Sequence, residues 1–168
     1  MNKTSFAGFL ILLGAGTCLT IPLGGVWRNS AFAEPAVSTN PSSPAIALTR
    51  EYIRGMEAGK LDALNALFLP NGRSWVLENA SDEGSWEHYR DHHLAPELKE
   101  APDFKFTIEK EAEDRFGPTS IVRQVGRFVV KVGEESKPYR AAVTYVVVED
   151  GGSLKIVHLH WSSRPDRK

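Results

Sequence analysis

The chain has 168 residues, of which 42% are hydrophobic, 24% charged and 10% aromatic. This composition is that of an ordinary globular protein and excludes collagen-like, low-complexity and disulfide-stapled chains. Twenty Lys and Arg side chains stand against 21 Asp and Glu, a formal charge of -1, so there is no strong basic field to recruit nucleic acid. We therefore expect one globular domain and no nucleic acid partner.

The first 33 residues have the features of a secretory signal peptide. Lys3 gives a cationic start, residues 6–23 are apolar and rich in glycine, and Ala31 and Ala33 are small residues at the positions that signal peptidase reads. We expect cleavage after Ala33, a periplasmic or secreted protein, and no stable membrane insertion after cleavage. The alternatives are an uncleaved membrane anchor and a lipoprotein signal ending at Cys18.

Cleavage after Ala33 has a measurable consequence for the mature chain. It would begin at Glu34, lose Cys18, the single cysteine, and change in formal charge from -1 to -3 because Lys3 and Arg28 leave without any acid. The intact mass of the protein from its native compartment should equal that of residues 34–168 with no disulfide. A membrane-bound species that retains residues 1–33 would contradict this expectation.

The rest of the chain predicts a linker followed by an α+β domain. Residues 34–44 are rich in Pro, Ser, Ala and Thr without periodicity, which predicts a flexible linker before a domain over residues 45–164. Apolar residues recur at helical spacing first, and β-branched and aromatic residues dominate later. The expected elements are helices 45–58, 60–69 and 85–98, a short strand 74–77, and four hairpin-linked antiparallel strands, 104–113, 119–132, 139–149 and 154–162. Such an order is typical of an α+β fold with helices on one face of the sheet.

Two phrases carry a resemblance to a known family. They are EAGKLDAL at residues 57–64, which joins two helices, and DGGSLKIVHLHWS at residues 150–162, which closes the sheet. Over residues 45–163 the chain resembles the nuclear transport factor 2-like superfamily, in particular its SnoaL-like and ketosteroid-isomerase-like branch. The resemblance implies a conical barrel of a strongly bent antiparallel sheet covered by three N-terminal helices, with a pocket and a homodimer. Members are isomerases, dehydratases, cyclases or binding modules, so the fold does not fix the function.

The histidines are the main functional clue because all five fall in two segments. Three lie on the third expected helix and two on the last expected strand: His88, His92, His93, His158 and His160. Strand side chains alternate, so we expect His158 and His160 to share one face with Ile156. At about 100° per residue, His93 lies between Trp86 and Tyr89 and is expected to point inward.

Three interpretations of these histidines stay open. They are core residues bonded to backbone carbonyls, ligands of a metal site, or a general acid–base pair with a carboxylate. The metal interpretation combines His93, His158 and His160 with Glu97, which lies within about 40° of His93 on the helix. Without cysteine in the mature chain, such a site would offer nitrogen and oxygen ligands, which suit Zn or Cu.

The sequence thus favours an exported, homodimeric domain that binds a small molecule or a divalent metal. The residues expected to line its pocket are Trp86, Tyr89, His93, Tyr145, His158 and His160. The alternative is an acid–base lyase, isomerase or hydrolase that uses a pocket histidine, and a third possibility is a purely structural histidine cluster in a homodimeric binding module. No catalytic set is assigned, because the acidic base and the Tyr/Asp donor pair of ketosteroid isomerases have no residue-by-residue match here.

Overall fold

The structure is a computed structural model that describes residues 36–38, 43–132 and 135–166. The signal peptide expected over residues 1–33 lies outside these ranges. Within the linker expected over residues 34–44, Ala36–Ser38 form a strand, β1, that pairs with the edge of the sheet. Among the described residues, no helix is both long enough and apolar enough to cross a membrane.

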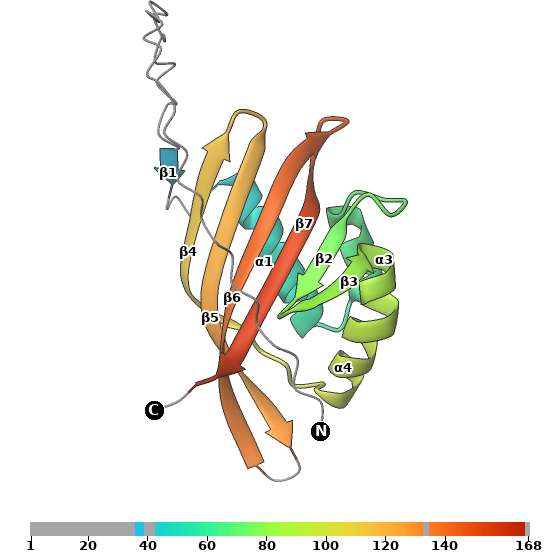
Figure 1. Cartoon of the computed structure of the whole chain (residues 1–168), viewed down its shortest axis with the longest axis vertical. Helices are drawn as coiled ribbons and strands as arrows, with labels where there is room; N and C mark the ends of the chain where they lie inside the picture. The colour runs from blue at the N-terminus through green and yellow to red at the C-terminus, as the bar shows by residue number, and fades with distance from the viewer. Residues whose placement is uncertain (1–35, 39–42, 133–134, 167–168) are drawn as a thin grey trace, which may run out of the picture. The chain divides into compact units, whose positions relative to one another are not determined.

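A curled seven-stranded sheet forms the body of the domain, with α1 running behind it (Figure 1). The helices are α1 (Pro44–Glu57), α2 (Leu61–Leu64), η1 (Asn65–Leu67), α3 (Trp86–Tyr89), η2 (Arg90–Leu94) and α4 (Ala95–Glu100). The remaining strands are β2 (Trp75–Glu78), β3 (Ser81–Ser85), β4 (Thr107–Phe116), β5 (Thr119–Val132), β6 (Glu135–Asp150) and β7 (Ser153–Pro165). They lie in the order β1-β4-β5-β6-β7-β2-β3.

The α+β fold expected from the sequence is confirmed, with one addition. Strands β4 to β7 pair antiparallel in chain order, as predicted. Strand β2, however, runs parallel to β7, and β3 folds back on β2 as a hairpin, where the sequence predicted only a turn after residue 77. This pairing brings β2 beside β7, although the paired residues are some 80 positions apart in sequence.

Helix α1 buries one face against the sheet. Its buried residues include Ile46, Thr49, Ile53 and Met56, at the three- and four-residue spacings of an amphipathic helix. The helix ends at Glu57, and Gly59 follows with φ of +63°, a conformation that glycine adopts without strain. The chain can therefore turn sharply into α2 and return to the core.

The third helical segment is continuous from α3 through η2 to α4. Ser85 caps its start, accepting a hydrogen bond from the backbone N–H of His88 at 3.3 Å. The η2 turn is a π-helical turn, a feature found frequently at functional sites. Along this segment Tyr89, His93 and Glu97 follow one another at four-residue intervals, and their side chains contact one another in turn.

A β-bulge in β7 corrects one expectation about the histidines. The register moves from Val147 opposite Ile156 to Val146 opposite His158, so Val157 is an extra residue in the strand. Ile156 is fully buried, and after the bulge Leu159 and Trp161 continue the buried face. The expectation that His158 and His160 share a face with Ile156 is therefore wrong, because one inserted residue reverses the alternation.

Candidate functional site

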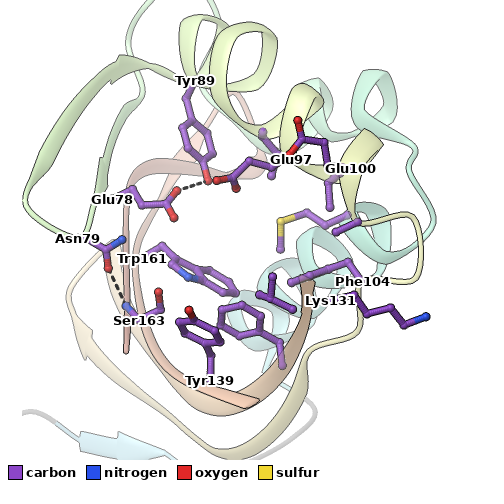
Figure 2. Close-up of a pocket in the computed structure, with 16 residues that line it drawn as sticks. Glu78, Asn79, Tyr89, Glu97, Glu100, Phe104, Lys131, Tyr139, Trp161 and Ser163 are labelled. Carbon is purple, nitrogen blue, oxygen red and sulfur yellow. Dashed lines mark hydrogen bonds between the residues drawn. The ribbon is translucent and has the colours of Figure 1, made fainter. Parts of the chain in front are cut away.

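A cavity of about 350 Å³ lies between the third helical segment and the far end of the curled sheet (Figure 2). Its volume is at the lower end of the range for small-molecule sites. Residues from α1, β2, the third helical segment, β5, β6 and β7 all contribute to its walls. The pocket is thus built from segments distant in sequence, and the β2–β7 pairing described above closes one side of it.

Aromatic side chains form one wall of the pocket. Trp161 projects into it from β7, with Phe104 at 6.4 Å and Phe128 at 5.9 Å between ring centroids. Phe128 in turn stacks on Tyr139 at 5.4 Å. Aliphatic side chains also line the pocket: Met56, Leu94, Leu98, Ala101 and Val130. The wall therefore favours a ligand with an apolar, preferably flat, body.

The opposite side of the pocket carries carboxylates. In Figure 2, Glu78 and Glu97 approach one another below Tyr89, whose hydroxyl donates a hydrogen bond to Glu78 Oε2 at 2.8 Å. Only 13% of the Glu78 side chain is exposed, whereas 59% of Glu97 is exposed. Within the described residues no donor is hydrogen-bonded to Glu78 Oε1, which leaves this oxygen available to a molecule in the pocket.

His93 lies at the centre of three carboxylates. Its Nε2 is 3.2 Å from Glu97 Oε1 and 3.5 Å from Glu78 Oε2, and its Nδ1 is 3.0 Å from Glu83 Oε2. The ring also lies 5.3 Å from that of Tyr89. One imidazole thus connects the two carboxylates that line the pocket with a third carboxylate behind them.

Burial and charge shift the proton affinities of this cluster. Burial raises the pKa of Glu78; the Tyr89 hydrogen bond and the charge of His93 oppose the rise, and the charges of Glu97 and Glu83 reinforce it. For His93, burial favours the neutral ring, but the surrounding carboxylates outweigh it and raise the pKa above 6.5. Burial also holds the pKa of Tyr89 well above 10. At neutral pH the Tyr89 hydroxyl therefore keeps its proton and donates a hydrogen bond to Glu78, and the imidazole of His93 beside it is readily protonated.

The structure distributes the expected pocket residues over three places. Tyr89 and Glu97 line the pocket, and His93 contacts the carboxylates at its polar end. Trp86 and Tyr145 are almost completely buried in the hydrophobic core and do not line the pocket. Both are flanked by Tyr52, at about 5.9 Å between ring centroids in each case.

His158 and His160 lie on the other face of β7 from Leu159 and Trp161. Burial, followed by the nearby His160, lowers the pKa of His158. His160 Nε2 lies 3.3 Å from the backbone carbonyl oxygen of Asn79. Among the described residues, the metal-ligating atoms that gather within 4.8 Å of one another belong to Glu78, His93 and Glu97, and neither strand histidine joins them. The expected three-histidine cluster is thus replaced by one histidine among carboxylates.

Glu78 is the residue that the sequence prediction missed. It ends a four-residue strand, and nothing in its neighbourhood in sequence marks it as different from the other acidic residues of the 78–100 region. Only the parallel pairing of β2 with β7, with Glu78 opposite Trp161, places its carboxylate at the pocket.

No protein-family model matches the chain, and a search of curated proteins finds no sequence match. Solved structures do match. A protein assigned as a ketosteroid isomerase from Shewanella frigidimarina NCIMB 400 is 17% identical with a TM-score of 0.63, over 73% of this chain and 98% of that one. A nuclear transport factor 2-like superfamily protein from Salmonella enterica serovar Typhimurium LT2 is 11% identical with a TM-score of 0.62, over 73% and 88% of the two chains.

A third similar structure is a protein assigned as a dehydratase of the same superfamily from Streptomyces avermitilis. It is 13% identical with a TM-score of 0.61, over 73% of this chain and 94% of that chain. At such identities the similarity concerns the fold, and function has to be argued from the site. The chain therefore has the nuclear transport factor 2-like fold, as its sequence phrases predicted.

Proposed function

We propose that this protein binds a small, largely apolar molecule in the 350 Å³ pocket and that Glu78 removes a proton from it as a general base. The single observation that carries the proposal is the largely buried Glu78 carboxylate, held by Tyr89 and beside His93, in the lining of an aromatic cavity. A carboxylate with a raised pKa in an apolar site is a stronger base than one in water.

His93 has a separate part in this proposal. Its carboxylate partners raise its pKa, so it can carry a proton near neutral pH and pass it on at the polar end of the pocket. Glu83, bonded to Nδ1, fixes the orientation of the ring and leaves Nε2 directed to Glu78 and Glu97. A base and a proton carrier side by side suit isomerisation or elimination, the kinds of reaction in which one proton leaves and another returns.

A carbon-acid probe tests the proposal without knowledge of the natural substrate. In 5-nitrobenzisoxazole a base takes the C3 proton, the N–O bond breaks, and the product is a coloured nitrile phenolate. We expect the wild-type rate to exceed that of Glu78→Gln by about 100-fold. Glu51→Gln, a change at an exposed residue of α1, should retain the wild-type rate. Equal rates for wild type and Glu78→Gln would refute the proposal that Glu78 is the general base.

Metal binding is a second candidate, favoured by the separation of the ligand atoms. Two ligands at about 2.1 Å from one ion lie at most about 4.2 Å apart. The 3.2 Å and 3.5 Å separations from His93 Nε2 to the two pocket carboxylates meet that limit. The Glu83–Nδ1 contact is the kind of outer partner that orients a ligating histidine. Glu78, His93 and Glu97 could thus hold Zn or Cu, with no part for His158 or His160.

Calorimetric titration with Zn²⁺ and Cu²⁺ separates this candidate from the first. Wild type and His160→Ala should bind the ion equally, and His93→Ala should lose at least about 10-fold in affinity. If His93→Ala binds as tightly as wild type, the cluster is not the metal site. If His160→Ala is the weaker binder, the three-histidine site predicted from the sequence would be restored.

We also propose a homodimer through the outer face of the sheet. One cross-strand row on that face consists of Ile121, Val146, His158 and Trp75, and Trp75 is 47% exposed. Such a partly apolar surface is typical of an interface between copies. Light scattering at micromolar concentration should give the mass of a dimer, and Val146→Glu should give a monomer. A monomeric wild-type protein would contradict the proposal.

A further inference from the structure

The charges that line the pocket are mainly negative. Glu78, Glu97 and Glu100 all contribute to the lining. Within the described part of the chain, Lys131 is the one lysine or arginine among the lining residues. Its side chain is 66% exposed, and its amine is paired with Asp103 at 2.9 Å. Even a protonated His93 balances only one of the three carboxylates that contact it. An anion that entered this pocket would lose its hydration beside uncompensated carboxylates.

The aromatic wall also favours a positively charged ligand. Aromatic faces carry negative potential, so a cation within about 6 Å of a ring centroid is attracted to it. Trp161, Phe128 and Tyr139 present such rings within the same cavity as Glu78. Figure 2 shows Trp161 between Glu78 and Tyr139, so one ligand can contact the carboxylate and the rings together.

We infer that the natural ligand is an organic cation, an amine with a flat apolar body. Its ammonium group would lie between Glu78 and Glu97, and its body against Trp161 and Phe128. The inference rests on the proposed pocket function, since it names the chemical class of the ligand for that site. Glu78 Oε1, free of donors within the described residues, is the acceptor for one ammonium hydrogen.

Three probes of equal size but different charge test the inference: 2-naphthylmethylamine, 2-naphthylmethanol and 2-naphthoate, titrated by calorimetry at pH 7 and low salt. We expect the amine to bind at least about 10-fold more tightly than the alcohol and the carboxylate to give no binding. Glu97→Gln, at a 59% exposed side chain that can change without loss of folding, should weaken only the amine. Glu51→Gln, outside the pocket, is the matched control.

The outcomes separate this inference from the pocket function itself. Equal binding of all three probes, or tighter binding of the naphthoate, would overturn the cation preference and leave the pocket as a ligand site. An amine that binds Glu97→Gln and the double variant Glu78→Gln/Glu97→Gln as tightly as wild type would also overturn it. If no probe binds, both the cation inference and the apolar pocket function fail.

Discussion

Replacing Trp86 with Ala should lower the free energy of unfolding by about 3–5 kcal/mol. The Trp86 side chain is 1% exposed and stacks on Phe68 with 3.9 Å between ring centroids and 3° between planes. It meets Tyr52 edge to face, and its indole N–H donates to Asn65 Oδ1 at 2.9 Å. The change would therefore leave a cavity where helix α1, the η1 turn and α3 meet, and would also remove a hydrogen bond.

Phe116→Ala is the matched control for this prediction. Phe116 is 48% exposed at the end of β4, so its loss should cost less than about 1 kcal/mol. Urea unfolding followed by circular dichroism compares the two variants, and Trp86→Phe should fall between wild type and Trp86→Ala. Similar losses for Trp86→Ala and Phe116→Ala would show that Trp86 is not central to the core.

Gln124→Leu should cost about 1–3 kcal/mol for each polar group that it leaves buried without a partner. Gln124 is fully buried in the sheet, where its amide accepts from the Tyr145 hydroxyl at 3.1 Å and donates to Thr49 Oγ1 at 3.2 Å. Thr49 retains its bond to the carbonyl of Ile46, so the Tyr145 hydroxyl is the group most affected. The leucine fills much the same space and adds no compensating hydrogen bond.

A double-mutant cycle separates this hydrogen bond from simple packing. Tyr145→Phe in the Gln124→Leu background should recover part of the loss, because it removes the unpaired hydroxyl. Tyr52→Phe is the contrasting control: its hydroxyl is buried with no hydrogen-bond partner among the described residues, so the change should be neutral or stabilising. Additive losses for Gln124→Leu and Tyr145→Phe would mean that the two side chains are not coupled.

Local patterns in the sequence predicted much of the fold and part of the site. The order of the three helical segments and of strands β4 to β7 followed from hydrophobic spacing, whereas β1 and β3 were not predicted. The same spacing predicted the position of His93 beside Tyr89 and Glu97 on one helical stripe, where the structure places them. Such contacts span three or four residues, the range in which helical geometry alone decides which side chains meet.

Contacts between distant segments could not be predicted from the sequence. The bulge at Val157 depends on how β6 and β7 pair, and one extra residue was enough to move His158 and His160 to the other face. Glu78 reaches the pocket only because β2 adds to the sheet in parallel beside β7. Trp86 and Tyr145 have the aromatic character of pocket residues, but the depth of the core, which spacing does not reveal, buries them.

The pH dependence of proton removal from 5-nitrobenzisoxazole, in wild type and Tyr89→Phe, tests the role of Glu78 most directly. Glu78 acts only when ionised, so the wild-type rate should rise with pH through a pKa above the ordinary 4.5 of a glutamate. The Tyr89 hydroxyl lowers that pKa, so its removal should move the midpoint to higher pH, while Glu78→Gln should abolish the rise. A midpoint that stays in place or moves to lower pH in Tyr89→Phe would contradict the assignment of Glu78 as the base.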